Sequence, residues 1–277
     1  MEKARLNDGR GIDIGEEPLG SKWKDREKVT WLDIYDRMKV DIPVGEVRGM
    51  KITKFEVKDP DDWTDADERR EDIISPLEYV RMLRDNRAPQ PGWYTRLSEG
   101  DQVWMSDTTA ERQDHAEPVM VIGHTKAERV VINGLGIGMV LAAALSYDHV
   151  KHVDVVEADD RVIELLGPHY QNDPRVHIHH GDAVEQMRKW CSDARWDVGW
   201  TDIWPEITPV NLPQMKLFTD FYGERCGFHG NWSEDIVKRD VWDNRYIEKA
   251  NLEYLTEADR AAFESDDEDA AWDMDDE

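Results

Sequence analysis

The fold of this chain is indicated by Arg129-Val-Val-Ile-Asn133-Gly134-Leu-Gly136-Ile-Gly138, which runs directly into Met139-Val-Leu-Ala-Ala-Ala-Leu145. A short β-branched run, three glycines at alternate positions and a segment rich in alanine and leucine are typical of a strand, a tight turn and a helix. Glycine at such a turn lets bare backbone approach a ligand, and the helix directs its N-terminal amides toward that ligand. The pattern therefore predicts the first half of a nucleotide-binding βαβ unit.

A carboxylate closes the second predicted strand. The apolar run His152-Val-Asp-Val-Val-Glu157 ends nineteen residues after Gly138. An acid at that strand end is placed to bind the two hydroxyls of a ribose. A single strand-end acid is more often solvated or a helix cap, so the interpretation depends on its spacing from the glycine turn.

Two further acids follow the next two predicted strands. The third strand, 175–180, leads into Asp182-Ala183, where the carboxylate could accept a hydrogen bond from an adenine amine or cap the following helix. The fourth strand, 196–202, ends in Asp202-Ile-Trp-Pro205. We predict that Asp202 orients an amine and accepts its proton. Trp204 would either form an apolar wall beside the substrate or pack in the core.

These four features, in this order, resemble the class I S-adenosylmethionine-dependent methyltransferases. The signature of that superfamily is a G-x-G-x-G turn, an acid closing the second strand, an acid after the third and a D/N-x-x-P-like motif after the fourth. The resemblance covers about residues 128 to 232 and implies S-adenosylmethionine as the cofactor. A nicotinamide cofactor fits less well, because its fingerprint places the third glycine where Met139 stands. The expected cofactor-binding residues are Asn133, Gly134, Gly136, Gly138, Glu157, Asp182 and Ala183.

Within that superfamily the chain resembles the spermidine-synthase-like branch. Two predicted strands, 93–97 and 102–108, lead into Glu111-Arg-Gln-Asp-His-Ala-Glu117. This arrangement is similar to the hairpin and the D-E-x-x-Y-H-E segment of aminopropyltransferases. The resemblance implies that Asp114 and His115 lie on the substrate side of the site.

Three positions depart from the pattern of that branch. Asp114 and Ala116 stand in place of the tyrosine and the glutamate of Y-H-E, and Ile137 stands in place of the acid within the glycine turn. We therefore expect an S-adenosylmethionine-dependent methyltransferase that acts on a small-molecule or protein acceptor, an amine or another cation. The alternatives are a spermidine-synthase-like aminopropyltransferase and a non-catalytic Rossmann-like protein that serves binding or assembly.

Composition and charge limit the kinds of binding partner and the cellular compartment that we expect. The chain carries a net charge of −26, of which −10 lies from Thr256 onward. An acidic body repels phosphate backbones, so a nucleic-acid partner is not expected, whereas cationic substrates are. Cys191 and Cys226 have no metal or disulfide spacing, and no apolar run of membrane length occurs. These features predict a cytoplasmic protein, which could form a homodimer. His177 and His179 share a strand face, but no further ligand cluster accompanies them, so no metal is expected.

The predicted fold class is α/β, with a Rossmann-like, mostly parallel sheet flanked by helices. A β-rich N-terminal region extends it, and too little ordered chain follows the fourth strand for a complete C-terminal antiparallel hairpin. A capping box at Ser75-Pro-Leu-Glu78 predicts a helix to about Asn86. The predicted divisions are an irregular leader, 1–27, an α+β region with a strand hairpin, 28–127, the Rossmann-like domain, 128–250, and an acidic tail, 251–277.

Overall fold

The computed structural model of the chain describes residues 31–64, 67, 73–75, 77, 79–80 and 87–244. The predicted leader and the predicted acidic tail lie outside these residues. So does most of the helix predicted from the capping box at Ser75.

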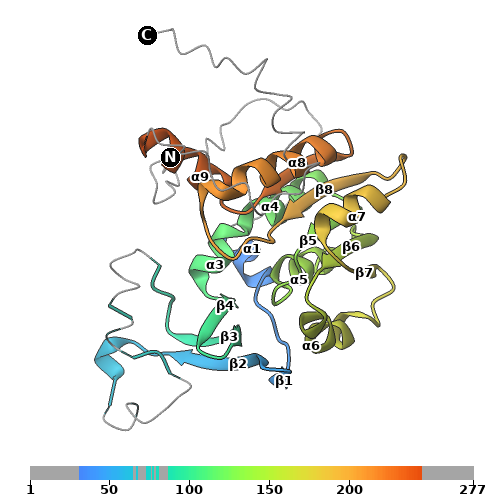
Figure 1. Cartoon of the computed structure of the whole chain (residues 1–277). Coiled ribbons are helices and arrows are strands. Elements are labelled where there is room, and N and C mark those ends of the chain that lie inside the picture. The colour runs from blue at the N-terminus through green and yellow to red at the C-terminus, as the bar shows by residue number, and fades with distance from the viewer. Residues whose placement is uncertain are drawn as a thin grey trace, which may run out of the picture.

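A five-stranded parallel sheet forms the centre of the described structure, with the strand order β7-β6-β5-β8-β9 (Figure 1). Each strand after the first is reached through a helix, as parallel pairing requires. The predicted α/β fold is therefore confirmed. The elements in chain order are β5 (Arg129–Asn133), α5 (Met139–Leu145), β6 (His152–Glu157), α6 (Asp160–Tyr170), β7 (Val176–His180), α7 (Ala183–Lys189), β8 (Trp196–Thr201), η4 (Pro209–Asn211), α8 (Leu212–Gly223), β9 (Cys226–Asn231) and α9 (Glu234–Asn244).

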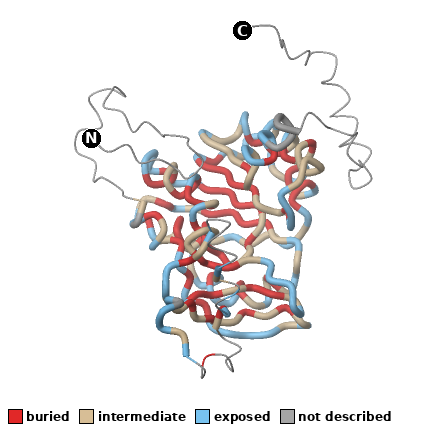
Figure 2. The backbone as a smooth tube through the Cα atoms, turned by 90° about the vertical axis from the view of Figure 1, so that its left-hand side faces the viewer, coloured by how far each residue is buried: buried red, intermediate tan, exposed pale blue. Residues whose placement is uncertain are grey.

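Helices cover both faces of this sheet. One apolar core joins the sheet to α5, α6, α1 (Trp31–Arg37) and α4 (Ala116–Thr125), and a second joins it to α7 and α8. Figure 2 shows the buried backbone of the strands gathered in the interior of the molecule. Strands covered on both faces read as nearly continuous apolar runs, which explains why β5 and β6 were predictable from sequence.

The N-terminal strands form a sheet of their own. β1 (Gly45–Val47), β2 (Met50–Val57), β3 (Gly92–Glu99) and β4 (Gln102–Ser106) pair antiparallel in chain order. A short 3-10 turn, η2 (Pro60–Asp62), follows β2, and α3 (Thr109–Asp114) connects β4 to α4. Figure 1 shows this sheet at the bottom of the molecule, away from α8 and α9. No antiparallel strand follows β9 among the described residues.

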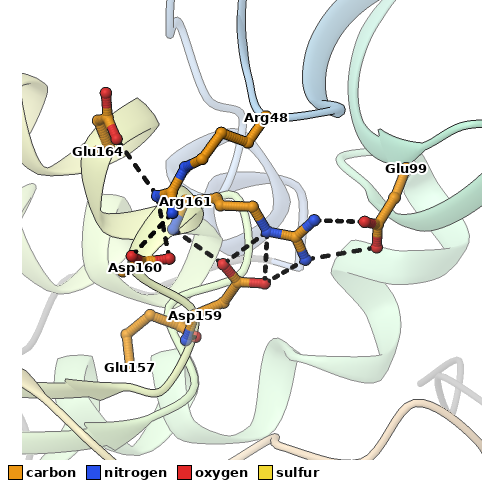
Figure 3. Close-up of polar contacts among 7 residues, drawn as sticks. All are labelled: Arg48, Glu99, Glu157, Asp159, Asp160, Arg161 and Glu164. Carbon is orange, nitrogen blue, oxygen red and sulfur yellow. Dashed lines mark hydrogen bonds and ion pairs between the residues drawn. The ribbon is translucent and has the colours of Figure 1, made fainter.

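Ion pairs join the two sheets near the carboxyl ends of β5 and β6 (Figure 3). Arg161, at the start of α6, contacts the carboxylates of Asp159, at 2.6 Å, and of Glu99, at the end of β3. Arg48, in the turn between β1 and β2, contacts Asp160 at 3.0 Å. These contacts hold the antiparallel sheet over the edge where the glycine turn lies.

Among the described residues, no helix is long and apolar enough to cross a membrane.

A buried carboxylate joins three strands of the parallel sheet. Asp154 of β6 accepts hydrogen bonds from His152 Nε2 at 2.8 Å, from His179 Nε2 at 2.9 Å and from Trp196 Nε1 at 2.8 Å. The side chain of His179 therefore links β7 to β6 through its hydrogen bond to Asp154. Burial by itself would raise the pKa of Asp154, but the hydrogen bonds from His179, Trp196 and His152 lower it overall, to about 2.

This carboxylate should make the fold sensitive to acid. Because the folded-state pKa of Asp154 lies below that of an ordinary aspartate, its contribution is complete above about pH 4 and is lost as the pH falls toward 2. We expect about 2 kcal/mol of the free energy of unfolding to depend on this ionisation. Urea unfolding of Asp154→Asn between pH 6 and 3 should show a weaker acid dependence than the wild type. Asp101→Asn, an exposed change in the β3–β4 turn, should keep the full dependence. An unchanged slope in Asp154→Asn would contradict the assignment.

Candidate active site

The glycine turn after β5 adopts backbone geometry that only glycine tolerates easily. Gly134 has φ +92° and Gly136 has φ +51°. A Cβ on Gly134 would lie 1.9 Å from the carbonyl oxygen of Asp202, and a Cβ on Gly136 would lie 2.5 Å from Sδ of Met105. The turn therefore passes directly beside the segment that follows β8, with Met105 of β4 covering it.

Glu157 lies against the same turn, as its spacing predicted. Its Oε2 accepts a hydrogen bond from the backbone N–H of Leu135 at 2.8 Å, and its Oε1 accepts one from the N–H of Asp159 at 2.8 Å. Burial raises the pKa of Glu157, and these backbone bonds oppose that shift. A carboxylate has about four acceptor positions, so the side chain can still accept a hydrogen bond from a ligand, and its contact with a ribose stays a prediction.

The structure places Asp182 as the N-cap of α7. Its Oδ1 accepts from the backbone N–H of Glu185 at 3.0 Å, and the residue is exposed, whereas Ala183 behind it is buried. This is the capping role that the sequence left open beside adenine binding. The adenine contact of Asp182 and Ala183 stays a prediction.

The side chain of Asn133 faces the core beneath α8. Its Oδ1 accepts from the Tyr222 hydroxyl at 3.2 Å, and its Nδ2 donates to Thr201 Oγ1 at 3.0 Å. Thr201 Oγ1 lies 3.0 Å from Nε2 of His229. This buried network ties β5 to β8 and β9 at their carboxyl ends. Asn133 therefore supports the turn from below, and the side chain does not line the pocket.

His115 and Asp202 meet at the centre of the candidate site. His115 Nε2 lies 2.8 Å from Asp202 Oδ2, and His115 Nδ1 lies 2.9 Å from the carbonyl oxygen of Glu111. The imidazole is buried, with 2% of its side chain exposed. Burial by itself would lower the pKa of His115, but the hydrogen bond and charge of Asp202, together with Glu111, raise it overall.

A narrow pocket connects this pair to the glycine turn. Its polar lining comes from His115 and Asp202, and Gly134 supplies bare backbone. The void is about 10 Å³, close to the size of one water molecule, so a larger ligand would enter only if side chains such as Met105 moved. The principal apolar walls are Met105, Ile132, Leu135, Met139 and Trp200.

Two more carboxylates lie near the pair. Burial raises the pKa of Glu111, whose carboxylate interacts electrostatically with His115, Asp114 and Asp202. Asp114 pairs with Arg87 at 2.8 Å and is largely covered. Arg87 thus neutralises Asp114, and Glu111 and Asp202 are the acids that face His115.

Trp204 lies apart from the pocket. Its indole N–H donates to Gln214 Oε1 at 2.7 Å, and its ring packs edge-on against Phe218 at 6.0 Å, inside the second core. Of the two roles considered for Trp204, the structure therefore shows packing in the core and not a wall beside the pocket.

Sequence reasoning missed three residues of the site, Met105, Trp200 and Glu111. The alternation of side chains along β8 places Trp200 on the same face as Val198. The residues that this face would meet in the folded protein were not predictable from sequence. The position of Met105 over the glycine turn depends on how the two sheets dock, for which the sequence carries no signal.

Comparison with known proteins gives the chemical context of this site. The family model of the spermine/spermidine synthase domain matches residues 116–225. A polyamine aminopropyltransferase of Prochlorococcus marinus (strain MIT 9313) is 36% identical over 164 residues, covering 56% of this chain and 54% of that protein. One from Pectobacterium carotovorum subsp. carotovorum (strain PC1) is 34% identical over 112 residues, covering 38% of this chain and 37% of that protein. The chain spans about half or less of the length of these curated relatives.

Solved structures resemble the chain more weakly. Spermidine synthase from Thermotoga maritima is 23% identical, with a TM-score of 0.33, and the match covers 39% of each chain. A methyltransferase from Podospora anserina is 14% identical, with the same TM-score, and the match covers 43% of this chain and 50% of that one.

The comparisons correct the function expected from sequence. The curated relatives are aminopropyltransferases, and the matching family model is that of spermine and spermidine synthases. The prediction of a methyltransferase that uses S-adenosylmethionine as methyl donor is therefore wrong. That prediction was based on Ala116 and Ile137, which differ from the aminopropyltransferase pattern. The chain around these two residues is nevertheless similar to aminopropyltransferases.

The close approach of Gly134 to Asp202 can be tested by stability. Gly134→Ala and Gly49→Ala both place a side chain at a similar positive φ, +92° and +87°, but nothing lies within 4 Å of a Cβ on Gly49. Both should lose about 1 to 2 kcal/mol to backbone strain. Gly134→Ala should lose about 1 to 3 kcal/mol more, because its methyl group meets the backbone of Asp202. Equal losses in urea unfolding would show that the two segments are not in contact.

Proposed function

We propose that this protein transfers an aminopropyl group from decarboxylated S-adenosylmethionine to an amine acceptor. The observation that carries the proposal is the contact between the donor turn at Gly134 and Asp202, whose carboxylate is held by the buried His115. The similarity to polyamine aminopropyltransferases supports the same chemistry.

The donor would lie along the carboxyl ends of β5 and β6. Glu157 is fixed by two backbone N–H groups and retains lone pairs for the ribose diol. The turn at Gly134 and Gly136 would present its backbone to the nucleoside, and the flexible Met105 side chain that covers Gly136 would move aside. The helix α5 follows directly and closes the pocket from behind through Met139.

The chemistry is a displacement at carbon. The lone pair of the acceptor nitrogen attacks the aminopropyl carbon bonded to the sulfonium, a C–N bond forms, and the C–S bond breaks with its electron pair passing to sulfur. The attacking nitrogen must give up a proton to become nucleophilic, which requires a base within hydrogen-bonding distance. Asp202 and His115 are the polar side chains of the pocket and supply that function.

Charge favours this donor over the ordinary cofactor. Decarboxylated S-adenosylmethionine bears only positive charges on its side chain, whereas S-adenosylmethionine carries a carboxylate. Asp202, the acid that lines the pocket, would attract the former and repel the carboxylate of the latter. The same charge favours a cationic acceptor such as a diamine.

Replacing Asp202 tests the proposed acceptor site. Asp202→Asn preserves shape but removes the charge that orients the amine and helps take its proton. We expect the rate of aminopropyl transfer to a diamine, measured at saturating donor by release of 5′-methylthioadenosine, to fall by about 100- to 10,000-fold. Asp220→Asn, an exposed substitution on α8, should leave the rate unchanged. A fully active Asp202→Asn enzyme would remove Asp202 from the reaction.

Donor discrimination gives a second test. Calorimetric titration should show that decarboxylated S-adenosylmethionine binds at least about 10-fold more tightly than S-adenosylmethionine, because the extra carboxylate meets like charges. Tighter binding of the carboxylated form would contradict the proposed donor.

A further inference from the structure

The hydrogen bonds of His115 determine how many protons its contact with Asp202 holds. The carbonyl oxygen of Glu111 accepts only, so the ring nitrogen facing it at 2.9 Å, Nδ1, must carry a hydrogen. A neutral imidazole has one N–H, which would leave Nε2 bare at 2.8 Å from a carboxylate oxygen of Asp202. Two bare acceptors at that distance repel each other. One additional proton therefore lies between His115 and Asp202.

That proton belongs on the imidazole. Free imidazole is the stronger base, with a pKa of about 6.5 against about 3.9 for an aspartate carboxyl. The direction of the His115 pKa in the protein agrees: the bond and charge of Asp202, together with Glu111, outweigh the effect of burial, and the pKa is raised. The contact is thus an imidazolium with both N–H groups bonded and a carboxylate.

We infer that the His115–Asp202 contact stores one proton, and that the ammonium group of an amine acceptor binds at Asp202 by displacing this proton to solvent. The first half of the inference stands on the geometry alone. The second half rests on the proposed function, because it takes an amine as the acceptor.

The surroundings of His115 support an exchange of one cation for another. The charged groups that face the ring are Glu111 of α3 and Asp202 after β8. Its other close neighbours are the rings of Trp200 of β8 and Trp232 after β9, with centroids 6.1 and 6.5 Å away. An ammonium bound at Asp202 would lie beside the imidazolium N–H, and two like charges in contact repel each other, so binding of the amine favours loss of the stored proton.

The exchange also prepares the base. When the stored proton has left, the Nδ1–H of His115 still donates to the carbonyl of Glu111, so Nε2 is the bare nitrogen and points toward Asp202 and the bound ammonium. Nε2 can then take the proton that the ammonium must lose before its nitrogen attacks. His115 would accept the proton, and Asp202 would orient the amine.

The stored proton can be observed directly in the protein alone. Nitrogen NMR of the full chain labelled in histidine should show both ring nitrogens of His115 protonated at pH 7, with the signal assigned by its loss in His115→Gln. His229 is an internal control, because burial lowers its pKa to about 4 and keeps it neutral. In Asp202→Asn an amide N–H can donate to Nε2, so His115 should become neutral. A bare ring nitrogen on His115 in the wild type at pH 7 would overturn the inference.

The exchange is measured by calorimetry at pH 7, with 1,4-diaminobutane titrated into the chain saturated with 5′-methylthioadenosine. Repeating the titration in two buffers of different ionisation enthalpy should reveal release of about one proton per diamine bound. Binding heat that does not depend on the buffer would overturn the exchange. Absence of diamine binding would refute the exchange and the proposed acceptor class together, while a doubly protonated His115 would still establish the stored proton.

Discussion

The adjacency of β5 and β8 is the constraint on which the candidate site depends. The backbone N–H of Asp202 donates to the carbonyl of Asn133 at 2.8 Å, and the next residue, Gly134, has no room for a Cβ beside the Asp202 carbonyl. Two strands that are 68 residues apart in sequence, paired at Asn133 and Thr201, thus bring a nucleotide-binding turn and a reactive acid to one point. In an open parallel sheet this edge is where ligands bind.

The antiparallel sheet and the helix after it complete the site. Met105 of β4 covers the glycine turn, and α3 carries Glu111 and leads to His115, the partner of Asp202. The ion pairs of Arg161 and Arg48 anchor this sheet to α6 (Figure 3). The parallel sheet therefore supplies the turn, Glu157 and Asp202, the antiparallel sheet supplies the cover, Met105, and the junction of α3 and α4 supplies His115.

Local patterns in the sequence predicted the parallel sheet and the positions of its strand-end acids, because buried strands and glycine turns have strong local signatures. Glu157 lies against the turn as its spacing required. The same reasoning could not separate cap from ligand at Asp182, or wall from core at Trp204, since both roles suit the same residue type. The hydrogen bond between His115 and Asp202 links residues 87 positions apart, and no local sequence pattern predicts it. The preference for methyl transfer failed because two substituted positions were given more weight than the similarity around them.

A crystal structure of the chain with 5′-methylthioadenosine tests the central claim most directly, because the nucleoside is the part of the donor that the turn should bind. The account predicts ribose hydroxyls on Glu157, a displaced Met105 side chain, and the sulfur beside the gap between Gly134 and the carboxylate of Asp202. A nucleoside bound elsewhere, or one whose sulfur points away from Asp202, would contradict it.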